Sequence, residues 1–262
     1  ELVRAGRARE VIRVVQEARK SAGLDVSDRI LLRLAAGAEL LEAIREHADL
    51  IADEVLAVHI ASVLSGTIDN ARLAAQELAA GGRSITVLDS GVSGGALGLA
   101  VLAAGEAGDA RRGAARAREC AARSRTFFLV DDLAGLRRGG RVDRTTALMG
   151  GALGIRPVLA MSAAGITVAE TVRGAARARR HLVAQAVRAA GGTRLSGPRP
   201  PLEPVRLAVH YGDDPARGRQ LENDVTEAMA RAGALVESVM RSPVDAAHRV
   251  HLGPGALGVA AS

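Results

Sequence analysis

The stretch His59-Ile60-Ala61-Ser62-Val63-Leu64-Ser65-Gly66-Thr67 decides how the chain is organised, because it indicates the end of a strand followed by the start of a helix. The hydroxyl residues Ser62, Ser65 and Thr67 gather at this junction. A helix N-terminus offers unpaired N–H groups to an anion, and hydroxyls can add further hydrogen bonds. The same pattern fits a plain helix N-cap made by Ser65 or Thr67, so both interpretations stay open.

Outward from this junction, apolar runs of strand length alternate with segments of helix length. The alternation is typical of βαβ units, so we predict an α/β fold that begins with a mainly parallel sheet. Further along, two apolar runs joined by Ser162-Ala163-Ala164 predict an antiparallel hairpin. Asp213 or Asp214 is expected to cap a helix that has Pro215 near its first turn. Strands are predicted over 55–60, 84–89, 126–130, 155–161, 165–172, 205–211 and 234–240, and helices over 2–22, 38–54, 67–80, 94–106, 109–123, 173–190 and 213–232.

The composition limits the function classes. The chain has 262 residues, of which 48% are hydrophobic and only 1% aromatic. This length is enough for one large or two ordinary domains. Because Phe127, Phe128 and Tyr211 are the only aromatic residues, the chain lacks the rings that stack on single-stranded nucleic acid. The core must be built from aliphatic side chains.

The positive charge is weak evidence for a nucleic-acid partner. The net charge is +6, yet Lys20 is the only lysine, and the bias towards Arg, Ala and Gly is what a GC-rich genome produces. Cys120 is the only cysteine, which excludes a disulfide framework or a cysteine-based zinc site and fits a reducing cytoplasm. No run of 18 uncharged apolar residues is present, so we expect a cytoplasmic protein without an integral membrane segment.

Three further patterns could bind a cofactor or a metal, but the sequence favours a structural explanation or lacks the other ligands. The run from Asp89-Ser90 to Gly98 lies at a second strand-to-helix junction, but it lacks the G-x-G-x-x-G spacing of a dinucleotide site. The segment Asp131 to Arg141 starts with acids and ends with bases, as a helix with favourable charges at both ends does. His248 and His251 are three residues apart and could face one metal, but the other ligands are missing nearby, so we predict no metal and no cofactor.

Taken in order, these segments resemble the DegV family of bacterial lipid-binding proteins over about residues 53–262. The resemblance is carried by the His59 to Thr67 block, by Asp89-Ser90, by the Asp132 to Arg141 block and by three later motifs. The later motifs are Ile155-Arg156-Pro157-Val158-Leu159 with Gly165, Val172-Arg173, and His251-Leu252-Gly253-Pro254-Gly255.

The resemblance implies two α/β domains that hold a long-chain fatty acid between them. Ser62 is then the first choice for the group that binds the carboxylate, with Ser65, Thr67 and Ser93 nearby and His251 donating from the second domain. Arg173 matches an arginine associated with phosphate transfer at a fatty acid kinase partner. Family members also have an N-terminal strand with Thr-Asp-Ser and a hydroxyl-rich loop, and neither is found in residues 1–54.

Residues 1–57 resemble another family, the isoleucyl-tRNA synthetases, in their C-terminal region that contacts tRNA. The resemblance rests on Glu1 to Arg13, Gln16 to Lys20 and Gly23 to Ile30, and it meets the DegV-like pattern at Glu54-Val55-Leu56-Ala57. We interpret the chain as a chimera. It would consist of a helical, synthetase-like appendix at 1–54, a partial first α/β domain at 55–150 and a second α/β domain at 151–262.

Two functional hypotheses follow from these resemblances. The leading one is a non-catalytic carrier that holds a fatty acid and presents its carboxylate to a partner such as a fatty acid kinase. The alternative is a tRNA-binding module in residues 1–57, with arginines such as Arg4 and Arg13 on the phosphates. An enzymatic role has no supporting constellation of residues, so we expect the chain not to be an enzyme.

Overall fold

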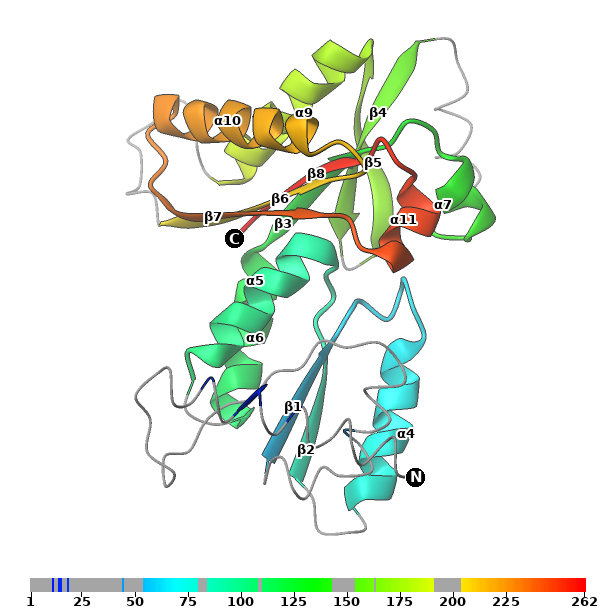
Figure 1. The fold of residues 1–262 in the computed structure, drawn as a ribbon, viewed down its shortest axis with the longest axis vertical. Coiled ribbons are helices and arrows are strands. Elements are labelled where there is room, and N and C mark those ends of the chain that lie inside the picture. Colours follow the sequence, from blue (N-terminus) through cyan, green and yellow to red (C-terminus); the bar gives the residue numbers. More distant parts are fainter. Residues whose placement is uncertain are drawn as a thin grey trace.

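The fold is built on two sheets, seen in a computed structural model of the chain (Figure 1). The structure describes residues 54–79, 84–107, 110–142, 154–162, 164–190 and 204–262, together with Val11, Val14, Val15, Ala18 and Ile44 in helical segments. The rest of the predicted appendix lies outside the described residues. No helix in the described ranges is long and apolar enough to cross a bilayer.

The strands form a two-stranded parallel sheet and a six-stranded mixed sheet, which confirms the predicted α/β class with a parallel first sheet. The small sheet pairs β1 (Glu54–His59) with β2 (Ser84–Asp89). The large sheet has the order β5-β4-β3-β8-β6-β7. Its strands are β3 (Arg125–Leu129), β4 (Ile155–Ser162), β5 (Gly165–Arg173), β6 (Val205–Tyr211), β7 (Val236–Pro243) and β8 (Leu257–Ala261).

The position of β3 differs from the βαβ expectation. This strand was expected to continue the first parallel sheet, but it pairs antiparallel with β4 on one side and with β8 on the other. The large sheet therefore takes strands from both sides of residue 150. The hairpin of β4 and β5 is confirmed as antiparallel.

Seven helices in the described ranges surround the sheets. In Figure 1, α9 and α10 lie on one face of the large sheet, and α5 lies on the other face, next to α6. The helix α4 packs on the small sheet, and α7 contacts α11. The helices are α4 (Thr67–Ala79), α5 (Gly94–Gly105), α6 (Ala110–Arg123), α7 (Ala134–Arg138), α9 (Ala175–Ala189), α10 (Pro215–Arg231) and α11 (Ala246–Leu252).

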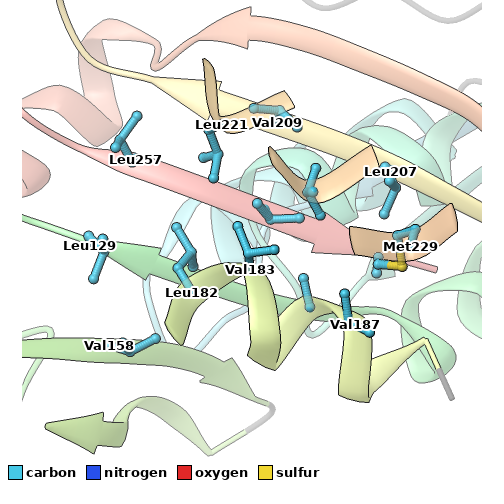
Figure 2. Packing of buried hydrophobic residues seen from close by; sticks show 14 of the residues in the cluster. Leu129, Val158, Leu182, Val183, Val187, Leu207, Val209, Leu221, Met229 and Leu257 are labelled. Atoms are coloured by element: carbon cyan, nitrogen blue, oxygen red, sulfur yellow. The ribbon is translucent and has the colours of Figure 1, made fainter. Parts of the chain in front are cut away.

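The alternation of side chains along β6 explains why both faces are covered. Leu207 and Val209 are fully buried in the core beneath α9 and α10, whereas Ala208, between them, belongs to the core beneath α5. Figure 2 shows Leu207 and Val209 packed with Leu182 and Leu221 in the first of these cores. The face towards α5 carries small residues, which leaves space there.

The cap of α10 agrees with the sequence and supports a prediction. The Asp214 carboxylate accepts hydrogen bonds from the N–H groups of Ala216, at 2.8 Å, and Arg217, at 3.4 Å, and Pro215 starts the helix. Replacing Asp214 by Ala is expected to lower the free energy of unfolding by about 1 kcal/mol, because these donors lose their acceptor. Urea unfolding measures this change.

The neighbouring Asp213 offers a matched control for the cap. Its carboxylate pairs with Arg249, and both side chains are half exposed. Asp213→Ala is expected to change the free energy of unfolding by less than about 0.5 kcal/mol, as exposed ion pairs contribute little. Equal effects of Asp213→Ala and Asp214→Ala would contradict the capping role.

Candidate functional site

A cavity of about 1090 Å³ lies on the face of the large sheet that carries α5, and it extends between β1, α4, α7 and α11. Small residues of the sheet and of α5, such as Ala208, Gly258 and Gly98, border it and leave the space open. Most of the other bordering side chains are aliphatic. They include Val58, Ile60, Leu64, Leu97, Leu136, Met161, Ile166, Met240, Leu252 and Leu257.

The glycine run after Asp89 brings α5 close to the sheet. A Cβ atom on Gly95 would lie 2.6 Å from the Cβ of Ala208 and 2.7 Å from Nε2 of His210, so only glycine fits at this position. Gly94, with φ of 56°, also adopts a conformation that favours glycine. The run therefore serves helix packing at the wall of the cavity.

The Asp89-Ser90 block ties the loops after β1 and β2 together. The Asp89 carboxylate accepts hydrogen bonds from the N–H of Ser62, at 3.3 Å, and of Gly91, at 2.9 Å. The Ser90 hydroxyl donates to the carbonyl of His59 at 2.6 Å. Burial raises the pKa of Asp89, but the hydrogen bonds from the Ser62 hydroxyl and from these N–H groups outweigh it, so the pKa is lowered.

The lowered pKa of Asp89 predicts a pH-dependent contribution to stability. The ionised carboxylate stabilises the fold above the ordinary carboxyl pKa of about 4, and this contribution is lost as the pH falls through the lower folded value. Asp89→Asn is expected to be less stable than the parent at neutral pH, with a gap that closes under acid conditions. Urea unfolding at about pH 7 and about pH 3 tests this, and a gap that stays constant would contradict it.

The polar end of the cavity joins α5 to α11. The Ser93 hydroxyl lies 2.6 Å from Nε2 of His248, and Nδ1 of the same ring lies 2.7 Å from Oδ2 of Asp245. Ser93, His248 and Asp245 all border the cavity. A serine, a histidine and an aspartate are thus connected in series at the cavity wall.

His210 lies beside this chain of hydrogen bonds. Its Nδ1 is 2.9 Å from the hydroxyl of Ser242, and its Nε2 is buried without a hydrogen-bond partner among the described residues. Burial is the main cause that lowers the pKa of His210, and the charge of His248 acts in the same direction. His210 therefore contributes a neutral ring to the cavity.

The structure brings four of the predicted ligand-binding residues to the cavity wall, namely Ser65, Thr67, Ser93 and His251. The Ser65 hydroxyl also accepts the N–H of Thr67 at 3.4 Å, so it serves the start of α4 as well. The ring of His251 packs against α7, where a Cβ on Gly139 would lie 2.5 Å from its Nδ1.

Two predicted residues lie elsewhere. Ser62 is exposed and directs its hydroxyl and its N–H to Asp89, and it is not among the described residues that border the cavity. Arg173 is exposed at the end of β5, opposite Ile155, and it too lies outside the described lining. Sequence reasoning missed the contact of His248 with Ser93 and the buried position of His210.

Metal chemistry finds no support in the described side chains. Across the ranges that the structure describes, no group of three or more His, Cys, Asp or Glu side chains is placed to hold a metal ion. What the arrangement offers is hydrogen bonds to an anionic or polar group in a cavity bordered mainly by aliphatic side chains.

Most of the chain is similar to proteins of one known family. The model of the DegV family, described as uncharacterised proteins, matches residues 34–262, and so begins before the predicted start at Asp53. A DegV domain-containing protein of Streptomyces coelicolor is 34% identical over 225 residues, which are 84% of this chain and 74% of that protein. One of Mycobacterium tuberculosis is 35% identical over 219 residues, which are 82% of this chain and 72% of that protein.

Solved structures show the same fold. A DegV family protein from Thermus thermophilus, described with fatty acid binding, has a TM-score of 0.71 and 28% identity, over 85% of this chain and 75% of that chain. DegV from Bacillus subtilis, described as a fatty acid binding protein, has a TM-score of 0.66 and 27% identity, over 84% of this chain and 74% of that chain.

A short part of the chain is similar to a different protein, an aminoacyl-tRNA ligase. Isoleucine–tRNA ligase of Cutibacterium acnes is 65% identical to this chain over 60 residues, which are 23% of this chain and 5% of the ligase. This likeness covers much less of the chain than the likeness to the DegV family.

Proposed function

Because the chain belongs to the DegV family, we propose that it binds one long-chain fatty acid, with the acyl tail in the aliphatic cavity and the carboxylate at the polar end. The observation that carries this proposal is the cavity of about 1090 Å³, which is bordered mainly by aliphatic side chains and also by Ser93. The fatty acid binding described for the relatives from Thermus thermophilus and Bacillus subtilis supports it.

The energetics fit an acyl tail. Burial of a methylene group contributes roughly 0.8 kcal/mol, so a tail of about 14–16 carbons supplies about 10 kcal/mol before the costs of ordering. Hydrogen bonds to a charged head group add about 1.5–3 kcal/mol each and mainly set its orientation. We assign these bonds to Ser93 and His251, with Ser65 and Thr67 nearby, and give Ser62 a supporting role through Asp89.

In this proposal the chain is a cytoplasmic carrier that presents the carboxylate to a partner. A fatty acid kinase is the partner that the family resemblance suggests, and the exposed Arg173 is our candidate for contact with its phosphate. The bond-forming step then belongs to the partner. An assay of the kinase with Ser93→Ala and His251→Ala carriers would show reduced formation of acyl phosphate if these residues hold the carboxylate.

The decisive experiment is the recovery of a bound lipid. Purified protein is denatured and extracted, and the extract is analysed by mass spectrometry. We expect about one fatty acid per chain. An empty extract, from protein that also fails to bind added fatty acid, would overturn the proposal.

The short likeness to isoleucine–tRNA ligase favours a second candidate function, tRNA binding by residues 1–57. Arginine contacts to phosphates make such binding strongly dependent on salt. A peptide of residues 1–57 is therefore expected to retain tRNA at low salt and to release it as the salt rises. Undetectable or salt-independent binding would dismiss this candidate.

A further inference from the structure

Ser93 occupies the N-cap position of α5, but its hydroxyl is used elsewhere. Its backbone is extended, with φ of −147° and ψ of 163°, and among the described residues its side chain accepts no hydrogen bond from the first turn. The hydroxyl instead lies 2.6 Å from Nε2 of His248, on α11. Ser93 is buried, with 7% of its surface exposed, and it borders the cavity. Its hydroxyl is therefore directed inward, towards the histidine.

Asp245 determines where the protons of His248 lie. Its Oδ1 accepts the backbone N–H of His248 at 2.9 Å, and its Oδ2 lies 2.7 Å from Nδ1 of the ring. Burial raises the pKa of Asp245, but the hydrogen bonds from the backbone N–H groups of His248 and Ala247 and from the His248 ring lower it, and a protonated His248 would lower it further, so the carboxylate is ionised. An ionised carboxylate can only accept, so Nδ1 carries a hydrogen and Nε2 faces Ser93.

The protonation of Nε2 decides what Ser93 can offer to a ligand. A serine has one hydroxyl hydrogen. With a neutral ring, that hydrogen is donated to Nε2, and an incoming carboxylate meets only oxygen lone pairs. With a protonated ring, Nε2 donates to Ser93, and the hydroxyl hydrogen is free to donate to the carboxylate. The charges then alternate from Asp245 to His248 to the ligand, which is the favourable order.

We propose that His248, held by Asp245, is the charged group of the head-group site and takes up a proton when a fatty-acid carboxylate binds at Ser93. This inference rests on the proposed function, and it adds that carboxylate binding and proton uptake are one coupled event. His248 acts here as a positioning residue for Ser93 and as the counter-charge of the ligand.

His210 and the two arginines that border the cavity are less suited to this role than His248. His210, on β6, is buried and its Nε2 has no described acceptor to stabilise a second proton. Arg241, on β7, pairs with Glu222 of α10, and Arg141 donates to the carbonyl of Leu64 at 3.1 Å. The remaining titratable side chains that border the cavity are His59 from β1 and His251 from α11.

Calorimetry of the delipidated full chain tests the coupling. Dodecanoate is titrated at about pH 7.5 in phosphate and in Tris, whose ionisation enthalpies differ, so the difference in heat counts the protons taken up. We expect between half a proton and one proton per dodecanoate. Linkage then requires the dissociation constant to rise up to about tenfold per pH unit as the pH increases.

Four variants separate His248 from its surroundings. His248→Gln and Ser93→Ala are expected to bind more weakly and without proton uptake, and Asp245→Asn to show reduced uptake. His251→Gln, a histidine one turn further along α11, is expected to weaken binding and to keep the uptake. Thermal unfolding of each variant checks that it is folded.

The outcomes separate the inference from its premise. Dodecanoate binding with the same heat in both buffers overturns the inference and leaves the carrier function in place. Uptake that persists in His248→Gln assigns the proton to another group and also overturns it. Failure of the parent chain to bind any fatty acid would remove the carrier function and the inference together.

Discussion

Replacing Gly98 by leucine is expected to lower fatty-acid occupancy sharply without weakening the fold. Gly98 lies in α5, borders the cavity, and a Cβ atom there would meet nothing within 4 Å. The leucine side chain therefore extends into the space assigned to the acyl tail. Displacing about three methylene groups costs about 2.4 kcal/mol, which is roughly a 50-fold loss of affinity. Titration with fatty acid and lipid extraction both measure this loss.

Gly98→Ala is the matched control for the blocking variant. A methyl group occupies little of the cavity, and alanine in place of glycine stabilises a helix by roughly 0.5–1 kcal/mol. We expect near-parental fatty-acid content and a slightly higher unfolding temperature. Full occupancy in Gly98→Leu would show that the ligand lies elsewhere and would contradict the assignment of the cavity.

Replacing Leu221 by alanine is expected to cost about 2–5 kcal/mol of unfolding free energy. Leu221 is fully buried between α10 and the large sheet, and Figure 2 shows it beside Val209 in the core beneath α9 and α10. Removing three carbons there leaves a void that rigid strands cannot close. A typical domain is stable by only 5–15 kcal/mol, so urea unfolding should show a large shift of the midpoint.

Leu73 offers the control for this core substitution. It lies on α4 and is 59% exposed. Leu73→Ala is expected to change the free energy of unfolding by less than about 0.5 kcal/mol. A cost for Leu221→Ala no larger than that of Leu73→Ala would contradict the packing described for this core.

Helices and strands with a clear hydrophobic periodicity could be predicted from the sequence, whereas the pairing of strands that lie far apart in the chain could not. The hairpin of β4 and β5 was predictable because two apolar runs flank the short link at Ser162 to Ala164. The strand β8 was missed because it is buried along its whole length and contains no polar side chain, so it shows no alternation of polar and apolar residues. The pairing of β3 with β8 joins distant segments, and no local pattern encodes it.

The same distinction holds for the candidate site, where local features could be predicted but contacts between distant segments could not. Hydroxyls at the start of α4 are a local signal that pointed to Ser65 and Thr67, whereas Ser93 was expected from the resemblance to the DegV family. The spacing of Asp245 and His248, typical of a helix N-cap, was also visible in the sequence. The contact between Ser93 and His248 spans 155 positions and depends on how α11 packs beside the cavity, which the fold alone determines.

The place of β8 between β3 and β6 has a consequence for the synthesis of the chain. Every other strand of the large sheet leaves the ribosome before β8, yet β8 carries the hydrogen bonds that join the two halves of that sheet. Until then β3 and β6 are two exposed edges, which favour aggregation. The nascent chain thus spends most of its translation with the sheet open, and we expect newly made protein to depend on chaperones until β8 inserts.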